Sequence, residues 1–285
     1  MSMYYDRRTR QTKTEAQYGG AYLNVLYHSA LGRCLLKLII SPGFSKINAV
    51  YQNSALSRHK IKGFIEQYHI DLKLYEDKHY HSFNEFFTRK KRHATFDENQ
   101  QTFISPADSR LLVYRIDQDL TIQVKQSCYT LKELLETDDD LKEYQNGSCL
   151  VFRLAMDDYH RYCFVDDGVL TGFKRIRGKL HTVSSISDHH KVYSQNTRVI
   201  NYLKTEHFDD LIFVEVGALL VGRIQNHNKT SYQKGEEKGY FELGGSTIII
   251  LTKKLVKIDD DIMEQSRQGI ETKVQYGEGI GVISC

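Results

Sequence analysis

Gly244, Gly245 and Ser246 carry the most distinctive chemistry in the sequence. They stand between a charged segment that begins at Lys234 and a run of β-branched residues that ends at Leu251. Two glycines allow backbone dihedrals that a side chain would forbid, and they leave the carbonyl of Gly245 open on both faces. The hydroxyl of Ser246 is next to that carbonyl, so it can attack and convert the peptide bond into an ester. A Gly-Gly-Ser sequence before a strand is also an ordinary turn, which is the simpler interpretation of these residues taken alone.

Three further blocks stand at the edges of expected strands. Asp108, in ISPADSRLLVY, could orient a base, although capping its own turn is the simpler role. His160, in FRLAMDDYHRYCF, could act as a base, although a lone histidine in a β core is more often structural. The glycines of VEVGALLVGRI allow another segment or a ligand to come close. Each block is a weak indication by itself.

Together and in this order, the blocks resemble the phosphatidylserine decarboxylase family. The resemblance covers nearly the whole chain and includes SFNEFFTRK, SPADSR, DYHRY, VEVGALLVGRI and KGEEKGYFELGGST. It implies a proenzyme that cuts itself between Gly245 and Ser246. Ser246 would be the nucleophile of a triad like that of serine proteases, oriented by a histidine and Asp108. The large chain would then run from Met1 to Gly245 and the small chain from Ser246 to Cys285.

The resemblance also implies the activity of the processed protein. Ser246 would become a pyruvoyl group with release of ammonia, and this group would be the covalent cofactor. Phosphatidylserine would form a Schiff base with it, and the conjugated system would accept the electrons released with carbon dioxide, giving phosphatidylethanolamine. A general acid is needed near the α-carbon, and His160 is the first candidate.

One departure from the family pattern leaves the base open. Members usually carry two histidines three residues apart in the DYHR block, and the second one is assigned to the triad. Here that position is Cys163, and a thiol with an ordinary pKa of about 8.5 is mostly protonated at neutral pH. In a regular strand His160 and Cys163 would point to opposite faces, so a substitute role for His160 requires a bulge or a bend. His181, in GKLHTV, is a third candidate.

Two other readings follow from the same residues. The change at Cys163 could leave a lipid-binding homologue that does not process itself and persists as a chain of 33.1 kDa. The presence of Asp108, His160 and Gly245-Ser246 counts against this alternative. A carrier domain of the biotinyl type would need a lysine at a hairpin tip, which the sequence lacks.

The expected fold class is α+β, with a predominantly antiparallel β core over residues 96–285 and a helical region over residues 1–95. Apolar residues at helical spacing predict an amphipathic helix from Ala21 to Ile40, and further helices are expected over residues 57–68 and 81–90. Short β-type runs dominate after Ala107, interrupted by one helical stretch over residues 129–145. The strands are expected in RLLVYRI, TIQVKQ, CLVFRLA, YHRYCFV, LIFVEVGALLVGRI and STIIILT.

Charge distribution indicates an anionic partner. Residues 1–62 hold ten basic and two acidic residues, a net charge of +8, whereas the whole chain carries +3. With an amphipathic helix and no RNA-binding signature, this favours an anionic membrane surface over nucleic acid. No apolar run reaches the roughly 18 residues that span a bilayer, so we expect peripheral binding at the cytoplasmic face of the cell membrane. Five cysteines without a CxxC pair predict neither a disulfide framework nor a metal site, and a homodimer is left open.

Overall fold

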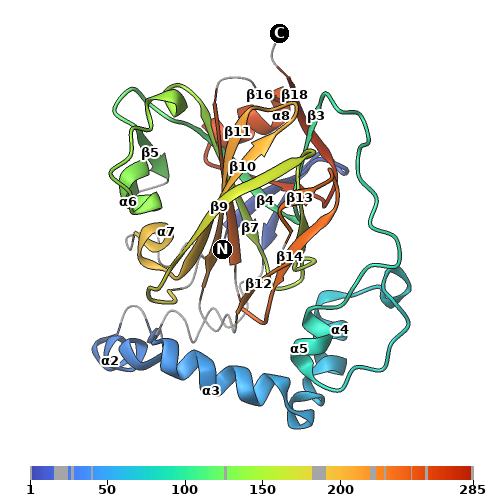
Figure 1. Cartoon of the computed structure of the whole chain (residues 1–285). Coiled ribbons are helices and arrows are strands. Elements are labelled where there is room, and N and C mark those ends of the chain that lie inside the picture. The colour runs from blue at the N-terminus through green and yellow to red at the C-terminus, as the bar shows by residue number, and fades with distance from the viewer. Residues whose placement is uncertain are drawn as a thin grey trace.

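The computed structural model describes residues 2–15, 25–26, 29–39, 41–124, 127–181, 191–218, 223–227, 229–244, 246–253 and 256–283. Its centre is a ten-stranded sheet in the order β13-β9-β10-β11-β15-β7-β4-β17-β1-β2 (Figure 1). Neighbouring strands are antiparallel except β1 and β17, which run parallel. A three-stranded sheet, β12-β14-β8, shares an apolar cluster with one face of the large sheet.

The strands of the large sheet are β1 (Ser2–Asp6), β2 (Gln11–Glu15), β4 (Ser109–Arg115), β7 (Ser148–Leu154), β9 (Gly168–Ile176), β10 (Arg198–Thr205), β11 (Asp210–Gly217), β13 (Ser231–Tyr232), β15 (Ser246–Thr252) and β17 (Glu271–Val274). The smaller sheets contain β8 (Arg161–Cys163), β12 (Ile224–Asn226) and β14 (Glu237–Phe241); β3 (Thr102–Ile104), β16 (Val256–Ile258) and β18 (Gly279–Ile283); and β5 (Thr121–Val124) with β6 (Ser127–Thr130). The helices are α2 (Ala30–Ile39), α3 (Pro42–Asn53), α4 (Lys60–Tyr68), α5 (Phe83–Phe87), α6 (Leu131–Leu135), α7 (Val192–Gln195) and α8 (Asp260–Arg267), with short 3₁₀ turns η1 (Ala55–Ser57), η2 (Leu72–Leu74) and η3 (Lys142–Tyr144).

The middle of strand β15 is an unbroken apolar run, Ile248–Leu251, because both faces of the strand are covered. It lies between β11 and β7. Ile248 and Ile250 belong to the apolar cluster shared with the smaller sheet, whereas Ile249 and Leu251 belong to the cluster on the opposite face. A strand buried on both faces needs apolar residues at every position. Ser246 is the first residue of this central strand and is held by it.

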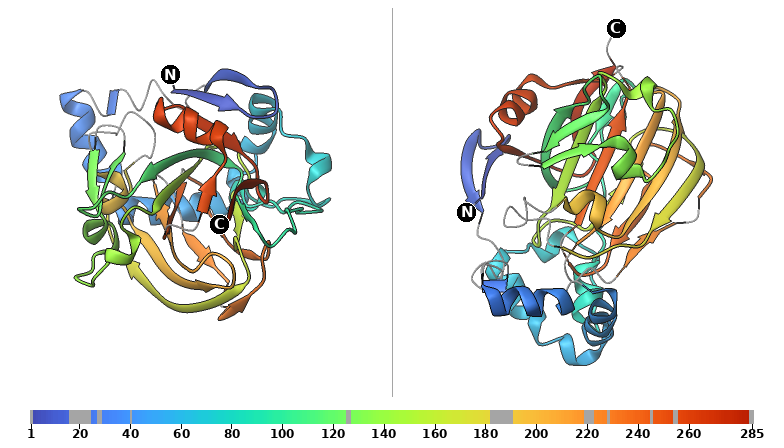
Figure 2. Two further views of the ribbon diagram at one scale, coloured as in Figure 1. Left: turned by 90° about the horizontal axis from the view of Figure 1, so that it is seen from above. Right: turned by 90° about the vertical axis from the view of Figure 1, so that its left-hand side faces the viewer.

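Helices α2 to α5 gather at one end of the sheets, at the bottom of Figure 1 and of the right-hand view in Figure 2. Helix α5 begins with the expected cap, because the Ser82 hydroxyl accepts the Glu85 N–H at 3.1 Å and the Glu85 carboxylate accepts the His81 N–H at 2.7 Å. The phenylalanines of α5 pack with Phe64 of α4 and with Leu243, shortly before the cleavage sequence. The helical region is therefore joined to the end of the sheet where Ser246 lies.

The β-rich α+β class is confirmed, and most of the expected strands are present. Strands β1 and β2 were not expected within the helical region, and they extend the large sheet. The helix expected over residues 21–40 is described as α2, while residues 16–24, 27–28 and 40 lie outside the described residues. The domain boundary near residue 95 stays a prediction. No helix in the described ranges is long and apolar enough to cross a membrane.

Candidate active site

Strand register brings Ser246 and Asp108 to the same end of the large sheet. Arg153 of β7 lies opposite Thr247 of β15 on one side and opposite Arg110 of β4 on the other. Ser246 is one residue from this row, and Asp108 is two residues from it. Their strands are two spacings apart, which corresponds to roughly 10 Å. Ser246 and Asp108 come from distant blocks of the sequence, but both lie at the same end of the large sheet.

The Ser246 hydroxyl is fully buried. Its residue has no exposed surface, and its Oγ has no hydrogen-bond partner among the described residues. Gly244 has a φ of 140°, a conformation that favours glycine. Gly245, the other half of the expected cleavage bond, lies outside the described residues. A buried hydroxyl without a partner costs free energy, so it marks a position where another requirement has outweighed stability.

His160 lies in the turn between β7 and β8. Its carbonyl accepts the N–H of Phe241, five residues before Ser246, at 2.9 Å. Leu154, the strand residue opposite Ser246, is the last residue of β7 and begins the same turn. The His160 ring is fully buried and packs on the Phe87 ring with centroids 4.1 Å apart. His160 is therefore held by both segments that adjoin the cleavage sequence.

The hydrogen bonds of His160 define which ring nitrogen can act as a base. Nδ1 lies 2.9 Å from the backbone carbonyl of Asp158. A carbonyl oxygen only accepts, so Nδ1 carries the hydrogen and Nε2 carries the lone pair. Nε2 is buried and has no partner among the described residues. Burial lowers the pKa of His160 to about 4, so the ring is neutral at physiological pH.

Asp158 holds the turn that presents His160. Its carboxylate accepts the Arg110 guanidinium at 2.6 Å and the N–H of Ala155 at 2.8 Å. Burial raises the pKa of Asp158, but the charge of Arg110, the Ala155 N–H and the charge of Lys273 together outweigh it, and the pKa is lowered overall. Asp158 therefore stays ionised. Its carboxylate ties the start of the turn, at Ala155, to Arg110 of β4. Its own carbonyl is the one that orients the imidazole.

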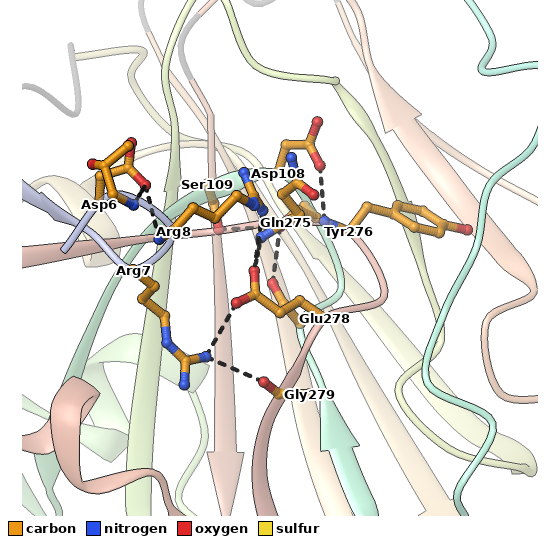
Figure 3. Close-up of polar contacts among 12 residues, drawn as sticks. Asp6, Arg7, Arg8, Asp108, Ser109, Gln275, Tyr276, Glu278 and Gly279 are labelled. Carbon is orange, nitrogen blue, oxygen red and sulfur yellow. Dashed lines mark hydrogen bonds and ion pairs between the residues drawn. The ribbon is translucent and has the colours of Figure 1, made fainter. Parts of the chain in front are cut away.

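Asp108 is occupied by a different cation. Both of its carboxylate oxygens lie 3.1 Å from Lys91 Nζ, and Oδ1 also accepts the N–H of Tyr276 at 2.8 Å. Figure 3 shows Asp108 next to the Gln275–Glu278 turn, which in turn contacts Arg7 and Arg8 of the β1–β2 hairpin. The contacts described around His160 do not include Asp108. The group next to His160 Nδ1 is the carbonyl of Asp158, and the orienting role of Asp108 stays a prediction.

Cys163 is buried, and the contacts described for its thiol do not include His160. Its thiol is 3.5 Å from the carbonyl of Pro106, which also accepts its N–H at 3.0 Å. Burial raises the pKa of Cys163 to about 12, so the thiol is protonated at neutral pH. A role for His160 in place of Cys163 was expected to need a bulge or a bend in their strand. The structure places His160 before β8 begins. The register shift lies in the partner strand β14, between Glu237 and Gly239.

His181, the third candidate base, reaches the same end of the sheet through Asn196. The Asn196 side chain accepts the His181 N–H at 2.9 Å and donates to the His181 carbonyl at 2.8 Å. The same amide nitrogen also donates to the carbonyl of Gly217, the β11 residue opposite Ser246, at 2.9 Å. The ring of His181 is buried and already has an interaction of its own. Of these candidates, His160 has a buried ring nitrogen, Nε2, for which the described residues offer no partner.

Sequence reasoning did not single out Asp158, Arg110 or Arg89. All three are charged residues that are almost fully buried. Asp158 and Arg89 stand inside apolar or aromatic surroundings in blocks that were quoted, MDDYHRY and NEFFTRK. A charged residue inside an apolar or aromatic block was the sign that could have identified them, because burying a charge costs free energy unless it has a partner.

Comparison with known proteins gives the family. The family model described as phosphatidylserine decarboxylase matches residues 83–282. A phosphatidylserine decarboxylase proenzyme 2 of Clostridium acetobutylicum is 51% identical over 282 residues, covering 97% of this chain and 97% of the relative. Phosphatidylserine decarboxylase proenzymes of Clostridium botulinum and Clostridium tetani are 41% and 40% identical, covering 99% and 100% of this chain and 99% of each relative. The chain therefore belongs to the phosphatidylserine decarboxylase family.

Proposed function

We propose that this chain cleaves itself between Gly245 and Ser246 and that the processed protein decarboxylates phosphatidylserine to phosphatidylethanolamine and carbon dioxide. Membership of the family supports a carboxy-lyase made as a proenzyme. One structural observation identifies the atoms that would react. The buried Ser246 hydroxyl and the lone pair of His160 Nε2 both lack partners within the described part of the chain, and they belong to adjoining segments.

Self-cleavage begins with a proton transfer. Nε2 of His160 takes the proton of Ser246 Oγ, and Oγ attacks the carbonyl carbon of Gly245. The peptide C–N bond breaks, the nitrogen of Ser246 receives the proton, and an ester joins the two residues. Loss of the α-proton of Ser246 then expels the Gly245 carboxylate. Hydrolysis with release of ammonia leaves the pyruvoyl terminus of the small chain.

The residues present fit a pyruvoyl group at position 246. A serine at the start of a buried strand, after glycine and with a buried base in an adjoining segment, is the donor set that its formation requires. The group supplies a ketone that takes up the substrate amine and the electron pair released with carbon dioxide. His160 is fixed through Nδ1 by Asp158 in an adjoining segment, and from there Nε2 would return a proton to the α-carbon of the substrate.

Helix α3 supplies an apolar surface for lipid. Ile47 and Val50 are 72% and 74% exposed, and Phe44 lies on the same stretch. Lys46 is an exposed cation on this helix, and apolar side chains with nearby cations suit the interface of an anionic bilayer. Arg7 and Lys13 of the basic segment are instead paired with carboxylates of the chain itself. We place the protein peripherally on the cytoplasmic face of the membrane, with α3 toward the lipid.

The comparisons give no support to the alternative of a lipid-binding homologue that does not process itself. The test of the proposed function is the intact mass of the purified protein under denaturing conditions. Two chains are expected, the smaller one beginning at residue 246 with the mass of a pyruvoyl terminus. The Ser246→Ala variant should remain a single chain of 33.1 kDa and release no carbon dioxide from phosphatidylserine vesicles. Cleavage of that variant, or a single chain from the unchanged protein, would refute the proposal.

A further inference from the structure

Arg89 is a buried cation for which no counterion is found among the described residues. Its residue is 2% exposed, and both Nε and one terminal nitrogen have no hydrogen-bond partner among the described residues. The other terminal nitrogen reaches the Tyr75 hydroxyl only at 3.4 Å. Placing a guanidinium in such surroundings is costly unless an acceptor completes it.

Comparison with the other buried arginines of the described chain shows how unusual this is. Arg110 and Arg153 are each bound by carboxylates at 2.7 Å or closer. Arg198 donates to several backbone carbonyls, the Leu134 carbonyl at 2.8 Å among them. Among the four buried arginines in the described ranges, Arg89 alone combines unpartnered nitrogens with the lack of a carboxylate partner. The acceptor it lacks must therefore come from outside the described residues.

Aromatic stacking does not replace that acceptor. The Arg89 guanidinium carbon lies 4.5 Å from the centre of the Tyr75 ring and 5.1 Å from that of Phe86. Such contacts stabilise the cation through its flat faces. The N–H groups point outward in the guanidinium plane and are not satisfied by rings above or below it. The rings hold the guanidinium in place and leave its edge available.

The segment that carries Arg89 lies against the candidate active site. Phe87 packs on the His160 ring, and the carbonyl of Thr88 accepts Arg161 Nε at 2.9 Å. The charge of Arg89 also acts on His160 and, with burial, keeps the ring neutral. An anion on Arg89 would therefore lie near a substrate atom that His160 protonates.

A hollow on the surface adjoins the same aromatic layer. It lies between α4 and residues 78–80, and its charged lining consists of three cations and one carboxylate: Arg58, Lys62, Lys78 and Glu66. Tyr80 lines it as well and packs edge-on against Phe86, with centroids 5.3 Å apart. Phe86 is one of the two rings that hold Arg89. This lining carries more positive than negative charge, which suits a negatively charged headgroup close to the aromatic layer that holds Arg89.

We propose that Arg89 binds the phosphodiester of the phospholipid headgroup and so positions the substrate at residue 246. This inference rests on the proposed function. The phosphodiester is favoured over the substrate carboxylate because decarboxylation removes the carboxylate charge. A cation bound to the carboxylate would stabilise the ground state more than the transition state. A cation on the phosphodiester holds substrate and transition state equally, so it lowers KM.

The test uses Arg89→Met, which keeps the length and apolar contacts of the side chain, and Lys90→Met as the matched control at an exposed neighbouring cation. Arg89→Met should complete self-cleavage, as seen by intact mass, and its KM for phosphatidylserine should rise roughly ten- to a hundredfold, as expected for one charge-assisted contact. Short-chain phosphatidylethanolamine, which keeps the phosphodiester but has no carboxylate, should lose inhibitory strength by the same factor. Arg89→Lys should recover part of both losses, and Lys90→Met should resemble the unchanged protein.

Several results would overturn this inference while leaving the proposed function intact. An unchanged KM in a cleaved Arg89→Met protein would remove Arg89 from binding. A raised KM with unchanged inhibition by phosphatidylethanolamine would assign Arg89 to the carboxylate. Inhibition of the unchanged protein by inorganic phosphate as strong as that by the short-chain lipid would indicate a free-phosphate site. In the uncleaved Ser246→Ala background, Arg89→Met should not lower the unfolding temperature, since it removes an unpaired buried charge; a clear decrease would indicate a structural role.

Discussion

His160 Nδ1 donates a hydrogen bond of 2.9 Å to the backbone carbonyl of Asp158, and this contact leaves Nε2 as the basic nitrogen. A histidine base is usually oriented by a group that accepts from its other nitrogen. Here that group belongs to the same short turn, and Arg110 fixes the turn through the Asp158 carboxylate. Asp108 is meanwhile bound to Lys91. The orienting group is thus local, although the residues that stabilise it come from elsewhere in the sheet.

Stability of the proenzyme should depend on pH through His160. Burial lowers its pKa from the ordinary 6.5 to about 4, so between these values the unfolded chain binds a proton that the folded chain does not. The neutral ring therefore makes its full contribution to the free energy of unfolding above pH 6.5. This contribution is lost as the pH falls toward 4. The loss amounts to about 3 kcal/mol at most. Urea unfolding of the Ser246→Ala proenzyme at pH 7 and pH 4.5 measures it.

Replacing His160 by glutamine in that same background removes the titrating group. The difference in the free energy of unfolding between the two pH values should then shrink by most of this amount. His93→Gln, at an exposed histidine, is the control and should leave the difference as it was. An undiminished pH dependence after His160→Gln would show that the ring is not held neutral.

Asp158→Asn tests the local orienting group. The amide keeps the size of the side chain but loses the charge that binds Arg110 and stabilises a protonated His160. Appearance of the small chain should slow by about tenfold or more, since a misplaced general base loses much of its effect. The pH at which cleavage falls should also move downward, because the pKa of His160 falls further without the carboxylate.

Asp157→Asn is the matched control for that experiment. Asp157 is the adjacent carboxylate, it is more exposed, and its contact with Arg110 is longer, at 3.7 Å. A purely structural effect would slow Asp158→Asn without moving its pH profile. Equal effects of the two substitutions would mean that Arg110 needs negative charge nearby but that Asp158 has no special position.

The sequence predicts those helices and strands that depend on a local property alone. The β-branched run from Ser246 to Thr252 predicts a buried strand, and Ser82 with Glu85 predicts the start of a helix. Strands β1 and β2 escaped notice because they are polar and pair at the edge of the large sheet, so no alternation of buried residues marks them.

The polar contacts of the site were harder to predict. Asp108 and Lys91 are close in sequence, but nothing local indicates that they pair, and Arg153 binds Glu271 across 118 residues. Motifs identified Ser246, His160 and Asp108 as one group. Which of them touch depends on the register of distant strands and on competition among buried charges. Neither can be read from residue types in one segment.

Cys163→Ala should leave self-cleavage nearly unchanged. Burial raises the pKa of the thiol to about 12, so at neutral pH it is protonated and cannot accept the Ser246 proton. The small side chain of alanine leaves a small cavity, which costs stability but not the base. The rate at which the small chain appears at pH 7, measured by intact mass, checks this. A loss of cleavage in Cys163→Ala that Cys163→Ser restores would return the residue to the mechanism.

Lys238 and Glu215 form a fully buried ion pair that joins the two sheets beside the site. Lys238 is the extra residue at the irregularity of β14 and reaches Glu215 of β11, which Asn201 and Asn226 also contact. Lys238→Met leaves an uncompensated buried carboxylate, so the free energy of unfolding of the Ser246→Ala proenzyme should fall by about 3–5 kcal/mol. Adding Glu215→Gln should recover a large part of the loss, because the buried charge is then removed.

The same pair also links the two segments that hold the reacting groups. Glu215 precedes Gly217, which lies opposite Ser246, and Lys238 precedes Phe241, which binds the carbonyl of His160. In the cleavable protein, Lys238→Met should therefore slow appearance of the small chain as well as destabilise the fold, and the double variant should regain both together. If stability returned without the cleavage rate, the charges themselves would act on the reaction. If cleavage were normal in Lys238→Met, the link between the sheets would not position Ser246 and His160.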